Sequence, residues 1–231
     1  MMILSISNPR DAMYNPSHFV ESRVEVLQTL VRAYPLATLI TLSNGGLVAN
    51  HIPMVVRQNG SPFGMLVGHV ARANTVWSAT DFTVPALVCF QGPQAYISPS
   101  LYATKQEHGK VVPTWNYVVV QASGPLTIHD DPVWVRAQVT ELTQQQEASR
   151  ATPWSVDDAP RDYTDAMLRV LVGISVPITT LTGKWKVSQN QPAANQASVV
   201  QALAQSPHDQ AHAMAQLVQQ AAQAALAVKR P

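Results

Sequence analysis

The chain has 231 residues, and its 15 basic side chains nearly balance its 14 acidic ones. This length can bury a full hydrophobic core, which favours one domain of generous size or one domain with an appendage. The balanced charge disfavours a protein that holds nucleic acid mainly through phosphates, although a local patch or a dimer groove could still contact DNA.

The cysteine content and the N-terminal residues suggest where the protein resides. Cys89 is the single cysteine, so no intrachain disulfide is possible, and its apolar neighbours predict a small core residue. The first residues lack a basic segment followed by a continuous apolar run, and no apolar stretch is long enough to span a membrane. We expect a soluble, cytoplasmic protein.

The first half of the chain predicts one helix followed by hairpin-linked strands. Val24, Leu27, Leu30 and Val31 recur at helical spacing, and Pro35 ends the helix. Asn44-Gly45-Gly46 is typical of a hairpin turn. The expected helices are 19–34 and 74–80, and the expected strands are 36–42, 47–56, 63–70 and 86–90.

The next part of the chain continues this mixture of strands and helices. Asp131 and Pro132 are suited to begin a helix. The expected helices are 132–149 and 162–168, and the expected strands are 117–128, 171–180 and 183–187. Six or more strands, largely antiparallel, predict an α+β fold that is mainly antiparallel β, with a closed or split β-barrel at its core.

The C-terminal residues differ in composition, because Ala and Gln predominate from Gln191 onward. Two helices are expected, at 196–205 and 208–226, with a break at Ser206-Pro207. Their Ala-rich stripes favour close packing on the barrel or on a second copy of the chain. The expected organisation is therefore a barrel domain over 13–190 and a helical extension over 191–231.

Aromatic and hydroxyl-bearing side chains are concentrated between two predicted core strands. Residues 90–117 read FQGPQAYISPSLYATKQEHGKVVPTWNY, and the first of these strands is expected to end at Gly92-Pro93. Such side chains can stack on a flat ring and form hydrogen bonds with its edges. The segment therefore predicts a site for a planar ligand with polar edges.

Four segments together resemble one known family. They are MYNPSHF (13–19), GHVARAN (68–74), the 90–117 segment and GKWKVSQN (183–190). They resemble the PaiB-type family of FMN-binding negative transcriptional regulators, and the resemblance covers about residues 13–220. It implies an FMN-binding split barrel with flanking helices, a homodimer with FMN at the subunit interface, and a regulatory role. Thr75 departs from the family, where proline is expected, and the C-terminal extension is less charged.

FMN carries a phosphate, and the segments around two strand ends offer groups to bind it. Arg72 and Asn74 lie at a strand-to-helix turn, where helix N-terminal amides favour an anion. The alternative is a solvated arginine at that turn. His51 and His69 could bind the phosphate or a ring carbonyl, or could be ordinary barrel histidines with internal partners.

The remaining candidates are aromatic, polar or cationic. Tyr96, Ser98 and Ser100 alternate and would face one side of an extended segment. Trp115 could stack on the ring and Asn116 could bind its edge, although a dimer-interface aromatic cluster explains both equally well. Lys186 and Gln189 are expected near the flavin, or else belong to an ordinary alternating strand with solvated lysines. These candidates are Tyr96, Ser98, Ser100, Trp115, Asn116, Lys186 and Gln189.

Other chemistry is poorly supported. His208 and His212 have the spacing of a zinc helix, but solvated histidines near a helix start explain them better, so no metal site is expected. No nucleophile elbow occurs, and no catalytic residue can be assigned. A flavin-dependent oxidoreductase and a split-barrel haem protein with an axial histidine stay open as alternatives. A helix-turn-helix with a basic recognition helix is not evident, so any DNA contact would use other surfaces.

Overall fold

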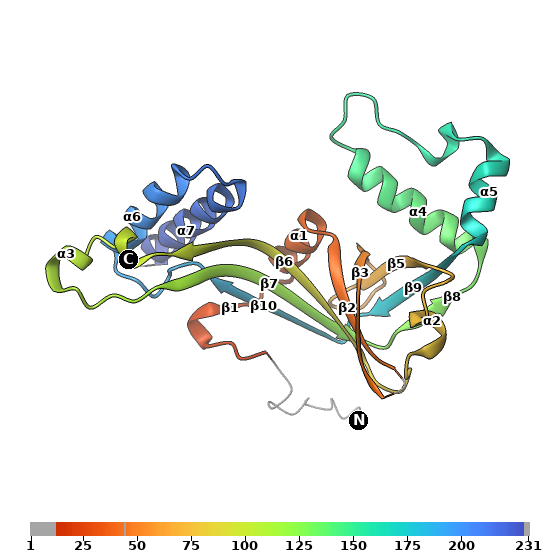
Figure 1. Ribbon diagram of the computed structural model, residues 1–231, viewed down its shortest axis with the longest axis horizontal. Coiled ribbons are helices and arrows are strands. Elements are labelled where there is room, and N and C mark those ends of the chain that lie inside the picture. Colours follow the sequence, from red (N-terminus) through yellow and green to blue (C-terminus); the bar gives the residue numbers. More distant parts are fainter. Residues whose placement is uncertain (1–12, 44, 229–231) are drawn as a thin grey trace. The chain divides into compact units, whose positions relative to one another are not determined.

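The computed structural model describes residues 13–43 and 45–228, a mixed α+β chain with mostly antiparallel strands (Figure 1). Asn44 of the predicted hairpin turn lies outside the described residues. Contacts divide the chain into two compact units. Unit 1 comprises Met1–Glu21, Pro93–Tyr117 and Lys184–Pro231. Unit 2 comprises Ser22–Gly92 and Val118–Gly183.

Three strands run from one unit into the other. They are β6 (Ala86–Ile97), β7 (Thr114–Gly124) and β10 (Thr180–Lys186). They belong to a six-stranded sheet with the order β1-β10-β7-β6-β2-β3, whose other strands are β1 (Val20–Glu21), β2 (Leu36–Ser43) and β3 (Gly46–Pro53). The expected α+β class is thus observed.

Unit 2 begins with a helix and a hairpin. Helix α1 (Val24–Ala33) buries Leu27, Leu30 and Val31, as the periodicity predicts. It begins later than expected, because Ser17–Phe19 forms the short helix η2 and β1 follows it. Strands β2 and β3 pair antiparallel from Leu36↔Pro53 to Ser43↔Gly46, and Gly45 provides the positive φ of the turn.

The second sheet of unit 2 has four strands in the order β4-β5-β9-β8. Their bounds are β4 (Val55–Arg57), β5 (Met65–Ala71), β9 (Leu171–Pro177) and β8 (Thr127–His129). The predicted strand 47–56 is therefore divided at Met54, and the predicted strand 117–128 is divided between β7 and β8. At these two points the chain leaves one sheet and joins the other. The alternation of hydrophobic residues does not by itself indicate such a change of sheet.

Helix α4 (Pro132–Glu147) packs on β5 and β9 of the second sheet. Gly173 of β9 pairs with both His69 and His129, and a Cβ there would lie 2.3 Å from the Trp134 ring. Glycine therefore permits the helix to approach the sheet closely. The remaining helices of unit 2 are α2 (Val76–Ala79), η4 (Val156–Asp158) and α5 (Arg161–Arg169).

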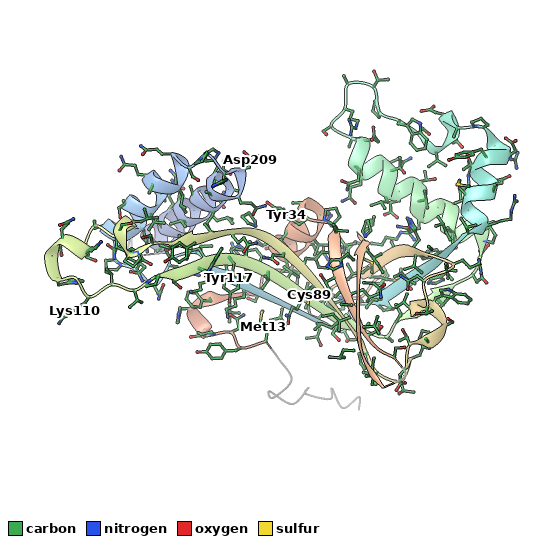
Figure 2. The ribbon with its side chains drawn as sticks, viewed as in Figure 1. Met13, Tyr34, Cys89, Lys110, Tyr117 and Asp209 are labelled. Carbon is green, nitrogen blue, oxygen red and sulfur yellow. The ribbon has the colours of Figure 1, made fainter. Side chains whose placement is uncertain are left out.

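The predicted break at Gly92-Pro93 is wrong, because β6 continues from Ala86 to Ile97. A Cβ on Gly92 would lie 2.9 Å from Leu30 and 2.7 Å from Val118. Glycine is needed there for close packing rather than for a turn. Cys89 lies half-buried on the same strand, and burial raises the pKa of its thiol (Figure 2).

Unit 1 contains the two C-terminal helices, α6 (Ala193–Ala204) and α7 (Asp209–Val228), which lie side by side in Figure 1. Their facing residues are buried, and they include Val199, Leu203, Met214 and Val218. The predicted helix pair is confirmed, although α6 begins at Ala193 rather than at 196 and α7 begins at Asp209 rather than at 208. The short helices η3 (Pro99–Leu101) and α3 (Lys105–His108) complete the unit.

Helix α6 is attached to the segment around η3. The Asn195 side chain accepts a hydrogen bond from the Thr104 amide at 3.0 Å, and the Ser198 hydroxyl donates to the Leu101 carbonyl at 2.7 Å.

In the described ranges, no helix combines the length and the apolar character needed to cross a membrane. The same residues contain no group of three or more histidine, cysteine or acidic side chains that could hold a metal.

Candidate functional site

An exposed aromatic pair lies where β6 and β7 pass through unit 1. Tyr96 and Trp115 are 51% and 52% exposed, and their ring centroids are 5.8 Å apart with the planes at 64°. Tyr117, labelled in Figure 2, lies further along β7. Two large rings left half-exposed provide apolar surface that a planar ligand or a partner chain could cover.

Lys186, at the end of β10, contacts the main chain of β7 at Trp115. Its ammonium group donates hydrogen bonds to the Thr114 hydroxyl and, at 2.9 Å, to the Trp115 carbonyl. Burial lowers the pKa of Lys186; Lys184 adds to this effect and Tyr117 opposes it. The side chain is therefore a partly desolvated cation held against the strand that carries Trp115.

Lys184 is a second cation in unit 1, and it was not among the predicted site residues. It is only 7% exposed, and its ammonium group donates to the Tyr14 carbonyl at 2.7 Å. The same group lies 5.3 Å from the Tyr14 ring and 5.5 Å from the Tyr117 ring. Neither Lys184 nor Lys186 forms an ion pair with a described carboxylate.

Asn116 and Gln189 hold the turn that follows β10. The buried Asn116 amide donates to the Ser188 hydroxyl at 2.8 Å, and Ser188 has a φ of 61°. The Gln189 side chain accepts from the Val187 amide at 2.8 Å and donates to the Trp185 carbonyl. A non-glycine residue with positive φ is uncommon and needs such support. Both side chains thus fix the chain immediately after Lys186.

Ser98 and Ser100 form a local pair at the start of η3. Their hydroxyl groups are 2.8 Å apart, and the Ser98 hydroxyl also accepts from the Ser100 amide. Ser98 therefore caps the short helix, and Ser100 remains exposed. Their expected role in ligand binding stays a prediction.

Arg72 lies in unit 2, where its guanidinium group is well supplied with protein partners. It donates to both carboxylate oxygens of Asp130, at 3.1 and 2.5 Å, and to the carbonyls of Arg169 and Leu171, at 3.0 and 3.2 Å. The hydrogen bond with Arg72 lowers the pKa of Asp130. A phosphate at Arg72 would therefore compete with a carboxylate that is already bound.

Asn74 lies two residues further along, just before α2. Its side chain accepts from the Val76 amide at 3.0 Å and donates to the Asn50 side chain at 2.8 Å. The Asn50 amide nitrogen is itself buried, without a hydrogen-bond partner among the described residues. This donor was not predicted from the sequence, because Asn50 looks like an ordinary residue of an alternating strand.

The two predicted histidines have different surroundings. His51 is exposed on β3, and His69 on β5 forms a hydrogen bond of 2.7 Å with the Gln138 side chain of α4. Gln138 is fully buried, and its amide nitrogen has no hydrogen-bond partner in the described structure. His69 thus has an internal partner, whereas His51 is available to solvent.

The predicted site residues fall into two sets. Unit 1 holds Tyr96, Ser98, Ser100, Trp115, Asn116, Lys186 and Gln189, and unit 2 holds His51, His69, Arg72 and Asn74. Within unit 1, the Tyr96 and Trp115 rings form a pair, and Lys186 donates a hydrogen bond to the Trp115 carbonyl. Half-exposed rings, hydroxyl groups and two lysines without carboxylate partners suit a planar, polar-edged, anionic ligand such as FMN. The donor chemistry of this unit therefore fits the cofactor.

This fold and this donor set define a flavin-binding split-barrel protein. The family described as "Putative FMN-binding domain" matches residues 13–180, so the chain belongs to this family. FMN is accordingly its cofactor, and the predicted resemblance to the PaiB-type family is confirmed.

Known relatives and a solved structure agree with this result. An uncharacterised protein of Emericella nidulans is 32% identical, over 81% of this chain and 89% of its own. The protease synthase and sporulation protein PAI 2 of Bacillus subtilis is 27% identical, over 90% of this chain and 97% of its own. The flavocytochrome Anf3 of Azotobacter vinelandii has the same fold, with a TM-score of 0.55, 12% identity, and coverage of 77% and 74% of the two chains.

Proposed function

We propose that the protein is an FMN-binding homodimer that acts as a negative transcriptional regulator. The observation that carries the ligand part is the pair of lysines in unit 1, Lys184 and Lys186, which have carbonyl, hydroxyl and aromatic partners but no described carboxylate. A cation without an anionic partner keeps its charge available for an anionic ligand.

The proposed FMN contacts begin with the half-exposed rings of Trp115 and Tyr96 and with Lys186, which donates to the Trp115 carbonyl. Lys184 is more buried, and its positive charge would attract the anionic ligand without direct contact. The other predicted contacts stay in the proposal, and they are His51, His69, Arg72, Asn74, Ser98, Ser100, Asn116 and Gln189. Of these, Asn116 and Gln189 would act by fixing the turn after Lys186.

Two features support the homodimer. Unit 1 exposes several large apolar side chains to solvent. In addition to the aromatic pair, Tyr14 is 83% exposed and Val112 is 73% exposed. The family resemblance implies that FMN lies at the subunit interface. We further propose that residues 13–190 form the flavin domain and that 191–231 form an extension packed on the barrel or on the partner. The expected cytoplasmic location also stays a prediction.

A titration with FMN tests the ligand site and the dimer together. Flavin fluorescence gives affinity and stoichiometry, and light scattering gives the mass of the complex. We expect one FMN per subunit of a dimer. The FMN affinity of Lys186→Met should be about tenfold weaker, because this variant loses one charge-assisted hydrogen bond. Lys105→Met removes an exposed lysine of α3 and is the matched control. Equal affinity in both variants would exclude Lys186 as a contact.

The regulatory part rests on similarity to the B. subtilis protein, whose name refers to protease synthesis and sporulation. It is tested by selecting binding sequences from a random DNA library, with and without FMN, and then titrating salt. A specific sequence whose affinity changes with FMN would support the proposal. Binding that is independent of DNA sequence and falls steeply with salt would contradict the proposal, because it would show only an attraction to DNA phosphates.

A second candidate function is a flavin-dependent oxidoreductase. The observation that favours it is the partly desolvated Lys186, bound to the main chain of Trp115, because a cation near the ring tunes the electronics of a bound flavin. Bound FMN would supply hydride or electron transfer. Oxidation of a nicotinamide cofactor with many turnovers per subunit, lost in Lys186→Met, would favour this function. A flavin that binds without turnover would favour the regulator.

A further inference from the structure

A second binding pocket lies in unit 2, between α4, η4 and α5. Its volume is about 600 Å³, within the range of small-molecule sites. Figure 1 shows α4 and α5 joined by the long connection that contains η4. None of the residues that line this pocket belongs to the proposed flavin contacts.

The charged lining is dominated by arginine. Arg136, Arg161 and Arg169 face Asp157 and Asp165, so three positive charges meet two negative ones and leave a net charge of +1. Arg136 forms a true ion pair with Asp157 at 2.6 Å. This contact leaves Asp165 as the other carboxylate of the lining.

The contacts of Asp165 are long. Its oxygens lie 3.9 Å from Arg136 and 3.9 Å from Arg161, beyond hydrogen-bond distance. The Arg169 guanidinium has no ion-pair partner among the described residues, although its main-chain carbonyl accepts from Arg72. The pocket therefore retains solvent-accessible guanidinium donors that no described protein group satisfies, and the Arg161 side chain is 92% exposed.

The rest of the lining is apolar. The apolar lining residues are Pro132 and Val133 in the first turn of α4, with Ala159 and Leu168. Val133 is 77% exposed to solvent. A bare ion would leave this surface uncovered. A ligand with an apolar body and one anionic group would cover it and satisfy the arginines at the same time.

We propose that this pocket binds a small organic monocarboxylate, held by Arg169 and Arg161 with its apolar body against Val133 and Leu168. The net charge of +1 matches a single carboxylate, and guanidinium groups bind carboxylates in a planar, bidentate manner. A phosphate dianion would exceed the available charge and would face Asp157 and Asp165. None of the proposed flavin contacts lines this pocket, so we expect it to bind its ligand with or without FMN.

The test is a titration of ¹⁵N-labelled, FMN-saturated protein with sodium benzoate, followed by nuclear magnetic resonance. We expect saturable shifts of the amide signals around Arg161, Leu168 and Arg169, and much weaker shifts with benzamide, the neutral isostere. Arg169→Gln should weaken benzoate binding about tenfold, and Arg161→Gln should weaken it similarly. Arg150→Gln, which removes an arginine that does not line the pocket, should leave it unchanged.

Several results would overturn the proposal. These are equal shifts with benzamide, unchanged affinity in both arginine variants, shifts confined to other segments, and no saturable shift at all. Tighter binding of inorganic phosphate than of benzoate would overturn the assignment of a carboxylate. The same titration without FMN separates this site from the flavin site, because the proposed shifts should persist in the absence of FMN.

Discussion

The two units hold their cations in different ways. In unit 2, Arg57, Arg72 and Arg136 each contact a carboxylate, on Glu141, Asp130 and Asp157 respectively. In unit 1, Lys184 and Lys186 contact only carbonyl, hydroxyl and aromatic groups among the described residues. A cation that is paired internally stabilises the fold, whereas a cation without an anionic partner is available for a ligand. The comparison therefore supports our proposal that the FMN contacts begin in unit 1.

The largest expected effect concerns the close packing within unit 2. A Cβ on Gly124 would lie 1.9 Å from the Pro177 carbonyl oxygen, so Gly124→Ala must displace one strand from another. We expect it to lower the free energy of unfolding by about 3 kcal/mol, measured by urea denaturation. Gly46→Ala, which meets no atom within 4 Å, is the control and should change stability by less than about 0.5 kcal/mol. Similar values for both variants would contradict this account.

The next effect tests the aromatic pair of unit 1. Trp115→Ala removes one of the two half-exposed rings and should weaken FMN binding about fivefold, as expected for one aromatic contact worth about 1 kcal/mol. Trp154→Ala is the matched control, because Trp154 is 49% exposed but belongs to unit 2. The measurement is quenching of flavin fluorescence. If Trp115→Ala instead dissociates the dimer and keeps FMN affinity, the ring serves the interface.

The lowered pKa of Lys186 predicts a pH dependence of FMN binding. As pH rises through this pKa, which burial holds below the ordinary value for lysine, the side chain loses its charge and the affinity should fall. In the wild type we expect the affinity to fall as pH rises from neutral into the alkaline range. Lys186→Arg keeps its charge in this range and should show a smaller fall. Ionisation of the flavin ring affects both proteins equally, so identical profiles would exclude Lys186.

The smallest effect concerns the exposed Arg72–Asp130 pair of unit 2. Arg72 lowers the pKa of Asp130 in the folded protein, so the pair contributes stability above the unfolded pKa, and this contribution is lost as pH falls. Asp130→Asn should therefore be slightly less stable at pH 7 and should lose less stability on acidification below about pH 4. Asp162→Asn is the control. If the stability of Asp130→Asn depends on acidic pH as that of the wild type does, the Arg72–Asp130 pair contributes nothing to stability.

The same variant sharpens the comparison between the units. If Arg72 binds the FMN phosphate, removing the competing carboxylate in Asp130→Asn should strengthen FMN binding, and Arg72→Ala should weaken it. If Arg72 serves only the fold, both variants should leave FMN affinity unchanged. The fluorescence titration that measures the wild type measures both variants.

Much of the fold could be predicted from local patterns. The periodicity of Leu27, Leu30 and Val31 predicted α1, and alternation with Gly45 predicted the β2–β3 hairpin. The predictions failed where tertiary contact outweighs local preference. Gly92-Pro93 reads as a break, but Gly92 lies inside β6 because Leu30 and Val118 leave no room for a Cβ.

Part of the candidate site could also be predicted. Tyr96, Trp115 and Lys186 were expected near one ligand. The structure pairs the two rings and joins Lys186 to the Trp115 carbonyl, and the shared ligand contact stays a prediction. Lys184 was missed, because an alternating strand containing two lysines normally exposes both to solvent. Asp130 was missed as the partner of Arg72, since 58 residues separate them in the chain.

The sequence by itself determined the family, the cofactor and the α+β class, because the strings around residues 90–117 and 183–190 are specific and local. Only the tertiary structure decided which charges are neutralised. An ion pair depends on the distance between side chains from separate strands and helices, and no local pattern encodes that distance. For this reason Arg72 and Lys186 looked equivalent in the sequence, while the structure gives one of them a carboxylate and leaves the other without one.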